Sequence, residues 1–293
     1  FLHLLCNKLF GYAAFLFKLN AVFNALIFKQ SSEELNKVKN KEKFIWCVFF
    51  GGICKLIEKN YSIETNNIKI AIIGSGPAGI ESAVELAKKY SVTVIADEIH
   101  CDITRPGTRY TPFAAVSETC REVSITCIAP TKTFNLAGLH TSAVYVPNPA
   151  LRRKVRHALH ADKFSAPNSF ATVATVAAFE QGEKWLDSLR EYVFENRKLV
   201  EAFLAEELPE ISAVKGDATY LVWLDISSLK ETGRNFAAYL RRKTGLFLIG
   251  GDVYGSGGEH FLRMNIACPR SICLDGLNRL KQGVKSFKTE NLG

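Results

Sequence analysis

Short apolar runs alternate with amphipathic stretches along much of this chain, and the alternation predicts an α/β fold. The runs IKIAIIG (68–74) and SVTVIA (91–96) have the length and the β-branched content of buried strands. Between them, the apolar positions of IESAVELAKKY (80–90) recur at helical spacing. The pattern therefore predicts a strand–helix–strand unit over 67–96, and such units build parallel sheets.

The later part of the chain continues the alternation. EVSITCIA (122–129) is typical of another buried strand, and TYLVWLD (219–225) alternates as a half-buried strand does. Residues 183–208 predict a long amphipathic helix. The apolar face of this helix is predicted to contain Trp185, Leu189, Val193, Val200 and Leu204.

The C-terminal residues predict a smaller α+β unit. Residues 245–271 indicate a strand, a glycine-rich loop and a second strand that carries Arg263, and residues 273–287 indicate a closing helix. We therefore expect two domains after an N-terminal segment. The first is an α/β cofactor-binding region at 67–180, and the second is a small α+β domain at 181–293.

Residues 1–66 contain two apolar runs, at 1–28 and 44–54, on either side of a polar, charged stretch. Lysines and asparagines interrupt the first run, and the second is too short to cross a bilayer. We expect both runs to form packed or interfacial helices, with a membrane anchor as the less favoured alternative. Because the chain begins with Phe1, we expect a processed chain or a fragment, and the role of this segment stays open.

Charge and composition exclude some classes of function. The chain has 293 residues and a net charge of +8, but its lysines and arginines are spread along the sequence and mixed with acids. They form no stripe interleaved with aromatic residues, so we expect no nucleic-acid binding. A phosphate-bearing cofactor or a small acidic substrate would need only a few local cations.

The eight cysteines form no C-x-x-C pair, and no cysteine–histidine cluster has zinc-finger spacing. In a chain of this size, we expect reduced thiols, a cytoplasmic location and no metal site.

A glycine-rich turn follows the first predicted strand. Gly74, Gly76 and Gly79 form the pattern G-x-G-x-x-G. The first glycine permits a tight turn, the second lets a phosphate approach the backbone, and the third lets helix and strand pack closely. The turn resembles the FAD- or NAD-binding fingerprint of the disulfide-oxidoreductase and amine-oxidase families, whose ribose-binding acid would here be Asp97 or Glu98.

The stretch CIAPTKTFNLAGL (127–139) places Lys132 among small, hydroxyl-bearing and apolar residues, with no carboxylate beside it in sequence. Lysine is seldom fully buried unless it is paired, so the position of this lysine needs a reason. Burial away from carboxylates lowers the pKa of a lysine amine. A neutral amine is nucleophilic and can attack an aldehyde.

Three segments give the chain a family resemblance: ADEIH (96–100), APTKTFNLAGL (129–139) and FLRMNIACPRS (261–271). In this order they resemble the pyridoxal-phosphate enzymes of the class I/II aminotransferase superfamily over residues 92–288. The resemblance is greatest to the C–S lyase branch of the MalY/PatB type. It implies a partial fold-type I fold, with a truncated three-layer large domain and a smaller α+β C-terminal domain, preceded here by the dinucleotide-type unit.

The resemblance also implies a role for each residue of these motifs. Lys132 would bind the cofactor covalently and act as the catalytic base. Asp97 would pair with the pyridine nitrogen. His100 stands at the position that faces the cofactor's phenolic oxygen, where aminotransferases usually carry tyrosine. Thr131 would approach the phosphate, and Arg263 would clamp the substrate's α-carboxylate through its planar fork.

The remaining motif positions show where the chain departs from its relatives. Asn135 and Gly138 would shape the loop, and Ala129 stands where relatives often carry serine, so one phosphate donor is missing. Relatives also carry a glycine-rich helix start, a stacking aromatic residue and an N-P-x-x-P-T-G segment upstream. None of these precedes residue 92 here.

The implied reaction is α,β-elimination, in which cystathionine or another cysteine S-conjugate gives a thiol, pyruvate and ammonia. The substrate would be a small amino acid, and because this superfamily builds each site from two subunits, we expect a homodimer. Three alternatives stay open: a pyridoxal-phosphate-dependent aminotransferase, an FAD- or NAD-dependent oxidoreductase fragment, and an inactive composite chain. Asp97 cannot serve a ribose and a pyridine nitrogen at once.

Overall fold

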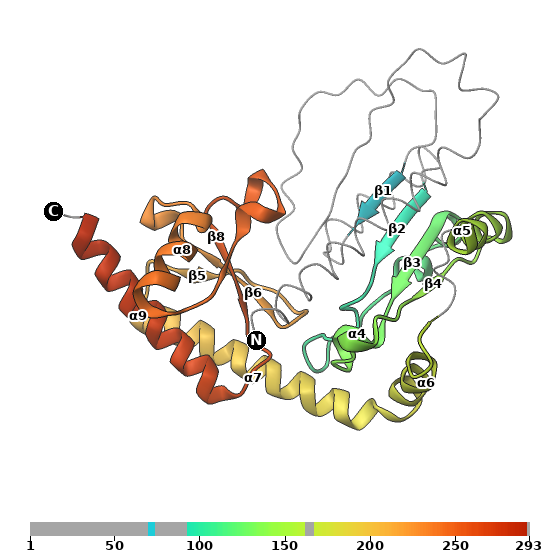
Figure 1. Cartoon of the computed structure of the whole chain (residues 1–293), viewed down its shortest axis with the longest axis horizontal. Coiled ribbons are helices and arrows are strands. Elements are labelled where there is room, and N and C mark those ends of the chain that lie inside the picture. The colour runs from blue at the N-terminus through green and yellow to red at the C-terminus, as the bar shows by residue number, and fades with distance from the viewer. Residues whose placement is uncertain (1–69, 74–92, 162–166, 292–293) are drawn as a thin grey trace, which may run out of the picture.

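The computed structural model describes residues 70–73, 93–161 and 167–291, which contain two four-stranded sheets (Figure 1). The first sheet has the order β1-β2-β3-β4, with three parallel strands and an antiparallel edge strand. These strands are β1 (Ile70–Ile73), β2 (Thr93–Asp97), β3 (Ser124–Ile128) and β4 (Ala143–Tyr145). Within the described residues, the strands predicted at 68–74 and 91–96 are confirmed over 70–73 and 93–96, and they pair in parallel as predicted.

The strand predicted at 122–129 is confirmed from Ser124 onward, but the prediction of its start was wrong. Its first two residues instead end the helix α3 (Glu118–Val123). The helix begins there because the Ser117 side chain accepts a hydrogen bond from the Cys120 N–H and caps the first turn.

Both faces of the first sheet are covered, which gives the expected layers. Val94 and Ala96 of β2 pack with the short helix η1 (Phe113–Ala115) and with α3, whereas Ile95 packs on the other face with α5 (Pro149–Ala161). Successive strand residues point to opposite faces, so this division follows from the apolar run itself. Helix α4 (Pro130–Thr133) follows β3 directly, and helix α6 (Ala171–Gln181) is the next α-helix after α5 in the described residues.

The second sheet is antiparallel throughout and has the order β5-β6-β8-β7. Its strands are β5 (Ser212–Ala213), β6 (Leu221–Asp225), β7 (Ile249–Gly250) and β8 (Phe261–Asn265). Three helices share its core, namely α7 (Glu183–Glu207), α8 (Gly233–Thr244) and α9 (Arg270–Asn291). Leu224, Leu262 and Leu277 are fully buried in this core.

The long helix α7 reaches from the second sheet to α6 near the first (Figure 1). Val193, Val200 and Leu204 are buried as predicted. The prediction that Trp185 shares this buried face was wrong, because the side chain is 48% exposed and its ring lies 5.9 Å from that of Phe134. The first turn of α7 extends beyond the second sheet, so Trp185 packs on the segment that carries Lys132 instead.

Some predictions fall outside the described residues. These are the predictions for residues 1–66, for the helix at 80–90 and for Gly74, Gly76 and Gly79. Within the described part, no helix has the length and apolar character that a bilayer span requires. In the same ranges, no three His, Cys, Asp or Glu side chains cluster as a metal site would need, and the five cysteines are free.

Candidate active site

The pairing of β2 with β3 brings the sequence-predicted residues together. Asp97 ends β2 and lies opposite Cys127 of the parallel strand β3. The segments that leave these strands therefore emerge at the same edge of the sheet, and the second of them is α4, which contains Lys132. The carboxyl edge of parallel strands is where α/β sheets bind ligands.

Asp97 is half-buried at this edge. Its Oδ1 accepts a hydrogen bond of 3.3 Å from the Ile99 N–H. Burial raises the pKa of the Asp97 carboxyl, while this hydrogen bond and the positive charge of Lys132 act to lower it. Lys132 is therefore within electrostatic reach of Asp97.

The proximity of Asp97 corrects the expectation that Lys132 has no carboxylate near it. No carboxylate lies beside it in sequence, but the parallel pairing of β2 and β3 brings Asp97 near it in space. Isolation from carboxylates therefore does not describe this lysine. The amine and the carboxyl instead lie near one another at the carboxyl edge of the sheet.

Three contacts set the position of the Lys132 segment. Pro130 occupies the first turn of α4, and the Thr133 hydroxyl donates a 2.9 Å hydrogen bond to Asp102 Oδ2. The Phe134 ring packs edge-on against Phe179 at 5.4 Å. A Cβ on Gly182 would lie 2.4 Å from the Phe134 ring, so this glycine permits the close approach.

The other motif residues around Lys132 are placed as follows. Thr131 lies half-buried in α4, immediately before Lys132. Ala129 is the N-cap residue of α4 and offers no side-chain hydrogen bond. Asn135 has a φ of 54°, a left-handed conformation that agrees with a loop-shaping part, whereas Gly138 has open space around it and no conformation that requires glycine.

His100 lies between the two sheets. Its Nδ1 is 3.1 Å from the Thr219 hydroxyl, and its ring meets Tyr220 edge-on at 5.3 Å. Burial, together with the positive charges of Lys132 and Arg263, lowers the pKa of His100 to about 4. The imidazole is therefore neutral at neutral pH.

Arg263 comes from β8 of the second sheet. Its guanidinium lies 4.6 Å from the centre of the Tyr254 ring. Among the residues that the structure describes, no acidic side chain forms an ion pair with it, and its charge acts on His100 and Tyr220. A half-buried guanidinium in such a position can bind an external carboxylate.

Glu98 points away from the candidate site residues Asp97, Lys132, His100 and Arg263. Its side chain is 4% exposed, its Oε1 accepts a 2.8 Å hydrogen bond from the Phe113 N–H, and Tyr110 hydrogen-bonds to it as well. Burial raises the pKa of its carboxyl. Glu98 is thus occupied by the protein's own groups, which argues against the ribose-binding role considered for it.

Sequence reasoning missed Thr219, Tyr220, Tyr254 and Asp102. The first two were assigned only to a strand, yet β6 begins after them at Leu221. Thr219 has a φ of 61°, which is rare for a β-branched residue, and no feature of the local sequence predicts this conformation. Only the tertiary fold places these residues against the predicted site.

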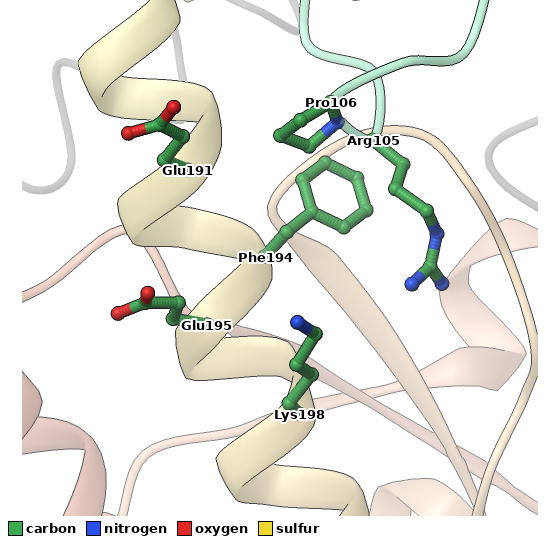
Figure 2. Close-up of a pocket in the computed structure, with 6 residues that line it drawn as sticks. All are labelled: Arg105, Pro106, Glu191, Phe194, Glu195 and Lys198. Carbon is green, nitrogen blue, oxygen red and sulfur yellow. The ribbon is translucent and has the colours of Figure 1, made fainter.

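A separate cavity lies between the loop that follows His100 and helix α7. It has a volume of about 310 Å³, and Figure 2 shows Phe194 at its centre, between α7 and Pro106. Its lining consists of Arg105, Pro106, Glu191, Phe194, Glu195 and Lys198. None of the sequence-predicted site residues lines this cavity, so the candidate chemistry lies elsewhere.

Comparison with known proteins identifies the family of this fold and site. Residues 77–279 match the family described as aminotransferase class I and II. A curated relative, the cystathionine beta-lyase PatB of Bacillus subtilis, is 41% identical over 197 residues. That alignment covers 67% of this chain and 51% of PatB, so the chain spans about half the length of the curated relatives it matches.

Two solved structures extend the comparison. Cystalysin from Treponema denticola, which contains a pyridoxal 5'-phosphate cofactor, superposes with a TM-score of 0.70 and 28% identity, covering 75% of this chain and 58% of cystalysin. The pyridoxal-phosphate-bound C–S lyase from Staphylococcus hominis superposes with a TM-score of 0.66 and 30% identity, again covering 75% and 58%. The expected fold class is confirmed, and no compared protein supports the FAD- or NAD-dependent alternative.

Proposed function

Because this chain belongs to the aminotransferase class I and II family, we propose that its site binds pyridoxal phosphate and acts on a small amino acid as a carbon–sulfur lyase. One observation carries the proposal. Lys132 of α4, which follows β3 of the first sheet, and Arg263 of β8 in the second sheet both act electrostatically on His100, so the two parts of the chain contribute to one site. Lys132 acts on Asp97 in the same way.

The donor set at this site suits the cofactor. A half-buried carboxyl at Asp97 fits a protonated ring nitrogen, and the adjacent Lys132 amine fits an aldehyde. The neutral His100 fits a phenolic oxygen, and the Thr131 hydroxyl fits a phosphate oxygen. Arg263, which has no acidic partner among the described residues, fits the carboxylate of an amino acid.

Pyridoxal phosphate, when bound, supplies an aldehyde carbon for an amine and a pyridine ring that withdraws electrons from the substrate's Cα. Lys132 would hold the cofactor at that carbon through Nζ, and its amine would take the proton from the substrate's Cα. Asp97 would hold the proton of the ring nitrogen, and Arg263 would orient the substrate by binding its α-carboxylate through two N–H groups.

The reaction that we propose is α,β-elimination. Removal of the Cα proton is followed by breakage of the Cβ–S bond, and the sulfur leaves as a thiol. The remaining carbon skeleton is hydrolysed to pyruvate and ammonia. The curated relative PatB is named a cystathionine beta-lyase, which favours cystathionine or another cysteine S-conjugate as the substrate. A histidine at position 100, where aminotransferases usually carry tyrosine, favours the lyase over the aminotransferase.

The proposal can be tested with purified chain, added pyridoxal phosphate and L-cystathionine. We expect pyruvate and thiol in equal amounts, and neither product from Lys132→Ala. Formation of a new amino acid from a 2-oxo acid, without thiol release, would instead establish an aminotransferase. A folded chain that binds no pyridoxal phosphate would overturn the proposal and leave the inactive composite chain.

We also propose that the chain forms a homodimer. The support is an exposed apolar stripe on and beside α6, with a residue every three positions. Its members are Phe170, Val173, Val176 and Phe179, of which the first two are 76% and 71% exposed. Such contiguous apolar surface is typical of an interface.

Two broader expectations remain proposals. The division into domains at 67–180 and 181–293 is supported by the two separate sheets and their separate cores. A cytoplasmic location is supported by the free thiols of the described cysteines.

A further inference from the structure

Thr219 adopts a backbone conformation that its side chain disfavours. Its φ is 61°, in the left-handed region, which is an outlier for a β-branched residue. Its N–H donates a 2.7 Å hydrogen bond to the Ile103 carbonyl, and its Oγ1 lies 3.1 Å from Nδ1 of His100. Backbone strain of this kind persists only where surrounding contacts enforce it, and it is concentrated at functional sites.

The contacts that enforce this conformation join the two sheets. Thr104 and Ala218 form an isolated antiparallel bridge, and the Arg105 N–H donates a 2.8 Å hydrogen bond to the Asp217 carbonyl. Arg190 of α7 donates two hydrogen bonds to Thr104, to its carbonyl at 2.9 Å and to its hydroxyl at 3.0 Å. The loop after His100 is therefore fixed against α7 and against the segment before β6.

The hydroxyl of Thr219 has a restricted choice of partners. Among the described residues, His100 Nδ1 is the acceptor within hydrogen-bond distance of Oγ1. If Nδ1 carried the ring proton, Oγ1 would accept from it and the hydroxyl proton would have no acceptor in this part of the chain. A half-buried donor without a protein acceptor costs free energy, which favours the arrangement in which the hydroxyl donates and Nδ1 accepts.

We propose that Thr219 is a positioning residue for His100, whose ring it orients and whose proton it confines to Nε2. Tyr220 meets the same ring edge-on, and Lys132 and Arg263 face it with positive charge. This environment keeps the ring from gaining a second proton. His100 is then a neutral hydrogen-bond donor through Nε2. This role rests on the proposed function: the Nε2 donor would face the phenolic oxygen of the cofactor, which needs a donor of fixed direction.

The test is a nitrogen-15 NMR measurement of the imidazole nitrogens in the full chain without cofactor, near pH 7.5. His100→Gln identifies the His100 signals. We expect Nδ1 to be unprotonated and Nε2 protonated in the wild type. Thr219→Val keeps the branched shape but loses the hydroxyl, so its His100 signals should shift toward a mixture of the two neutral forms. Thr219→Ser keeps the hydroxyl and should restore the wild-type signals.

Two results would overturn the proposal: a wild-type His100 that carries its proton on Nδ1, or a folded Thr219→Val chain with unchanged signals. If Thr219→Val does not fold, the wild-type and Thr219→Ser spectra still decide the matter. Because no cofactor is present, this outcome is independent of whether the chain is a lyase. In a chain that turns over cystathionine, we further expect Thr219→Val to lower kcat by about 10- to 100-fold and to change KM much less.

Discussion

The Thr133 hydroxyl lies 2.9 Å from Asp102 Oδ2, and this hydrogen bond ties the residue after Lys132 to the loop after Asp97. Thr133 is fully buried. The helix α4 has only one turn, so it has little stability of its own and depends on such contacts. The relative position of the Lys132 amine and the Asp97 carboxyl therefore depends on this hydrogen bond as well as on the pairing of β2 with β3.

Replacing Thr133 with valine should destabilise the chain by about 1–3 kcal/mol, because the shape is retained while the Asp102 carboxylate loses a buried donor. Urea unfolding measures this change. Thr289→Val is the matched control, since the Thr289 hydroxyl bonds to its own helix at an exposed position and its loss should change stability by less than about 0.5 kcal/mol. Equal losses of unfolding free energy in the two variants would show that the hydrogen bond to Asp102 stabilises the chain no more than an exposed one.

His100 should make the chain sensitive to acid. Burial and the charges of Lys132 and Arg263 hold its folded-state pKa at about 4, below the 6.5 of an unfolded histidine. The unfolded state therefore binds the proton first, and stability is lost as pH falls from 6.5 towards 4. Between pH 7.5 and pH 4.5, His100→Gln should lose about 2–3 kcal/mol less unfolding free energy than the wild type.

The control for this measurement is His157→Gln, which alters an exposed histidine on α5. Its pH profile should follow that of the wild type. An unchanged profile for His100→Gln would mean that the ring is solvated and protonates normally.

Arg263→Lys should weaken substrate binding while the charge is retained. Lysine cannot form the planar two-point contact with a carboxylate, and it would not lie over the Tyr254 ring as the guanidinium does at 4.6 Å. We expect KM for L-cystathionine to rise on the order of 10- to 100-fold, with a smaller change in kcat. Arg279→Lys, on the exposed face of α9, should leave both constants unchanged. Similar constants for the two variants would remove Arg263 from the substrate site.

Val173→Asp should abolish self-association. A charge in the middle of the apolar stripe beside α6 would be buried without a partner in a dimer, at a cost of several kcal/mol. Sedimentation velocity should show a dimer for the wild type and a monomer for the variant. Val253→Asp places the same charge at another exposed valine, in the second half of the chain, and should remain dimeric. A dimeric Val173→Asp chain would place the interface elsewhere.

The meeting of Asp97 and Lys132 could be predicted from sequence because it follows from strand pairing. Two runs rich in β-branched residues predict two neighbouring parallel strands. Parallel strands place the residues that follow them at the same edge of the sheet. The motif around Arg263 likewise has a local pattern, an alternating strand after a glycine-rich loop.

The contact between Thr219 and His100 could not be predicted in that way. The two residues are 119 positions apart, and the positive φ of Thr219 opposes its local preference, so only the packing of the two sheets produces it. The prediction that Trp185 lies on the buried face of α7 was wrong for a related reason. Helical periodicity gives the face of a residue but not where the neighbouring sheet ends.

The most direct test of the account is to locate the covalent attachment site of pyridoxal phosphate. The cofactor is added to the purified chain, the complex is reduced with borohydride, and peptide mass spectrometry identifies the modified lysine. We expect a single phosphopyridoxyl group on Lys132, which should be lost in Lys132→Arg and reduced in Asp97→Asn. Modification spread over exposed lysines, or its persistence at full extent in Lys132→Arg, would contradict it.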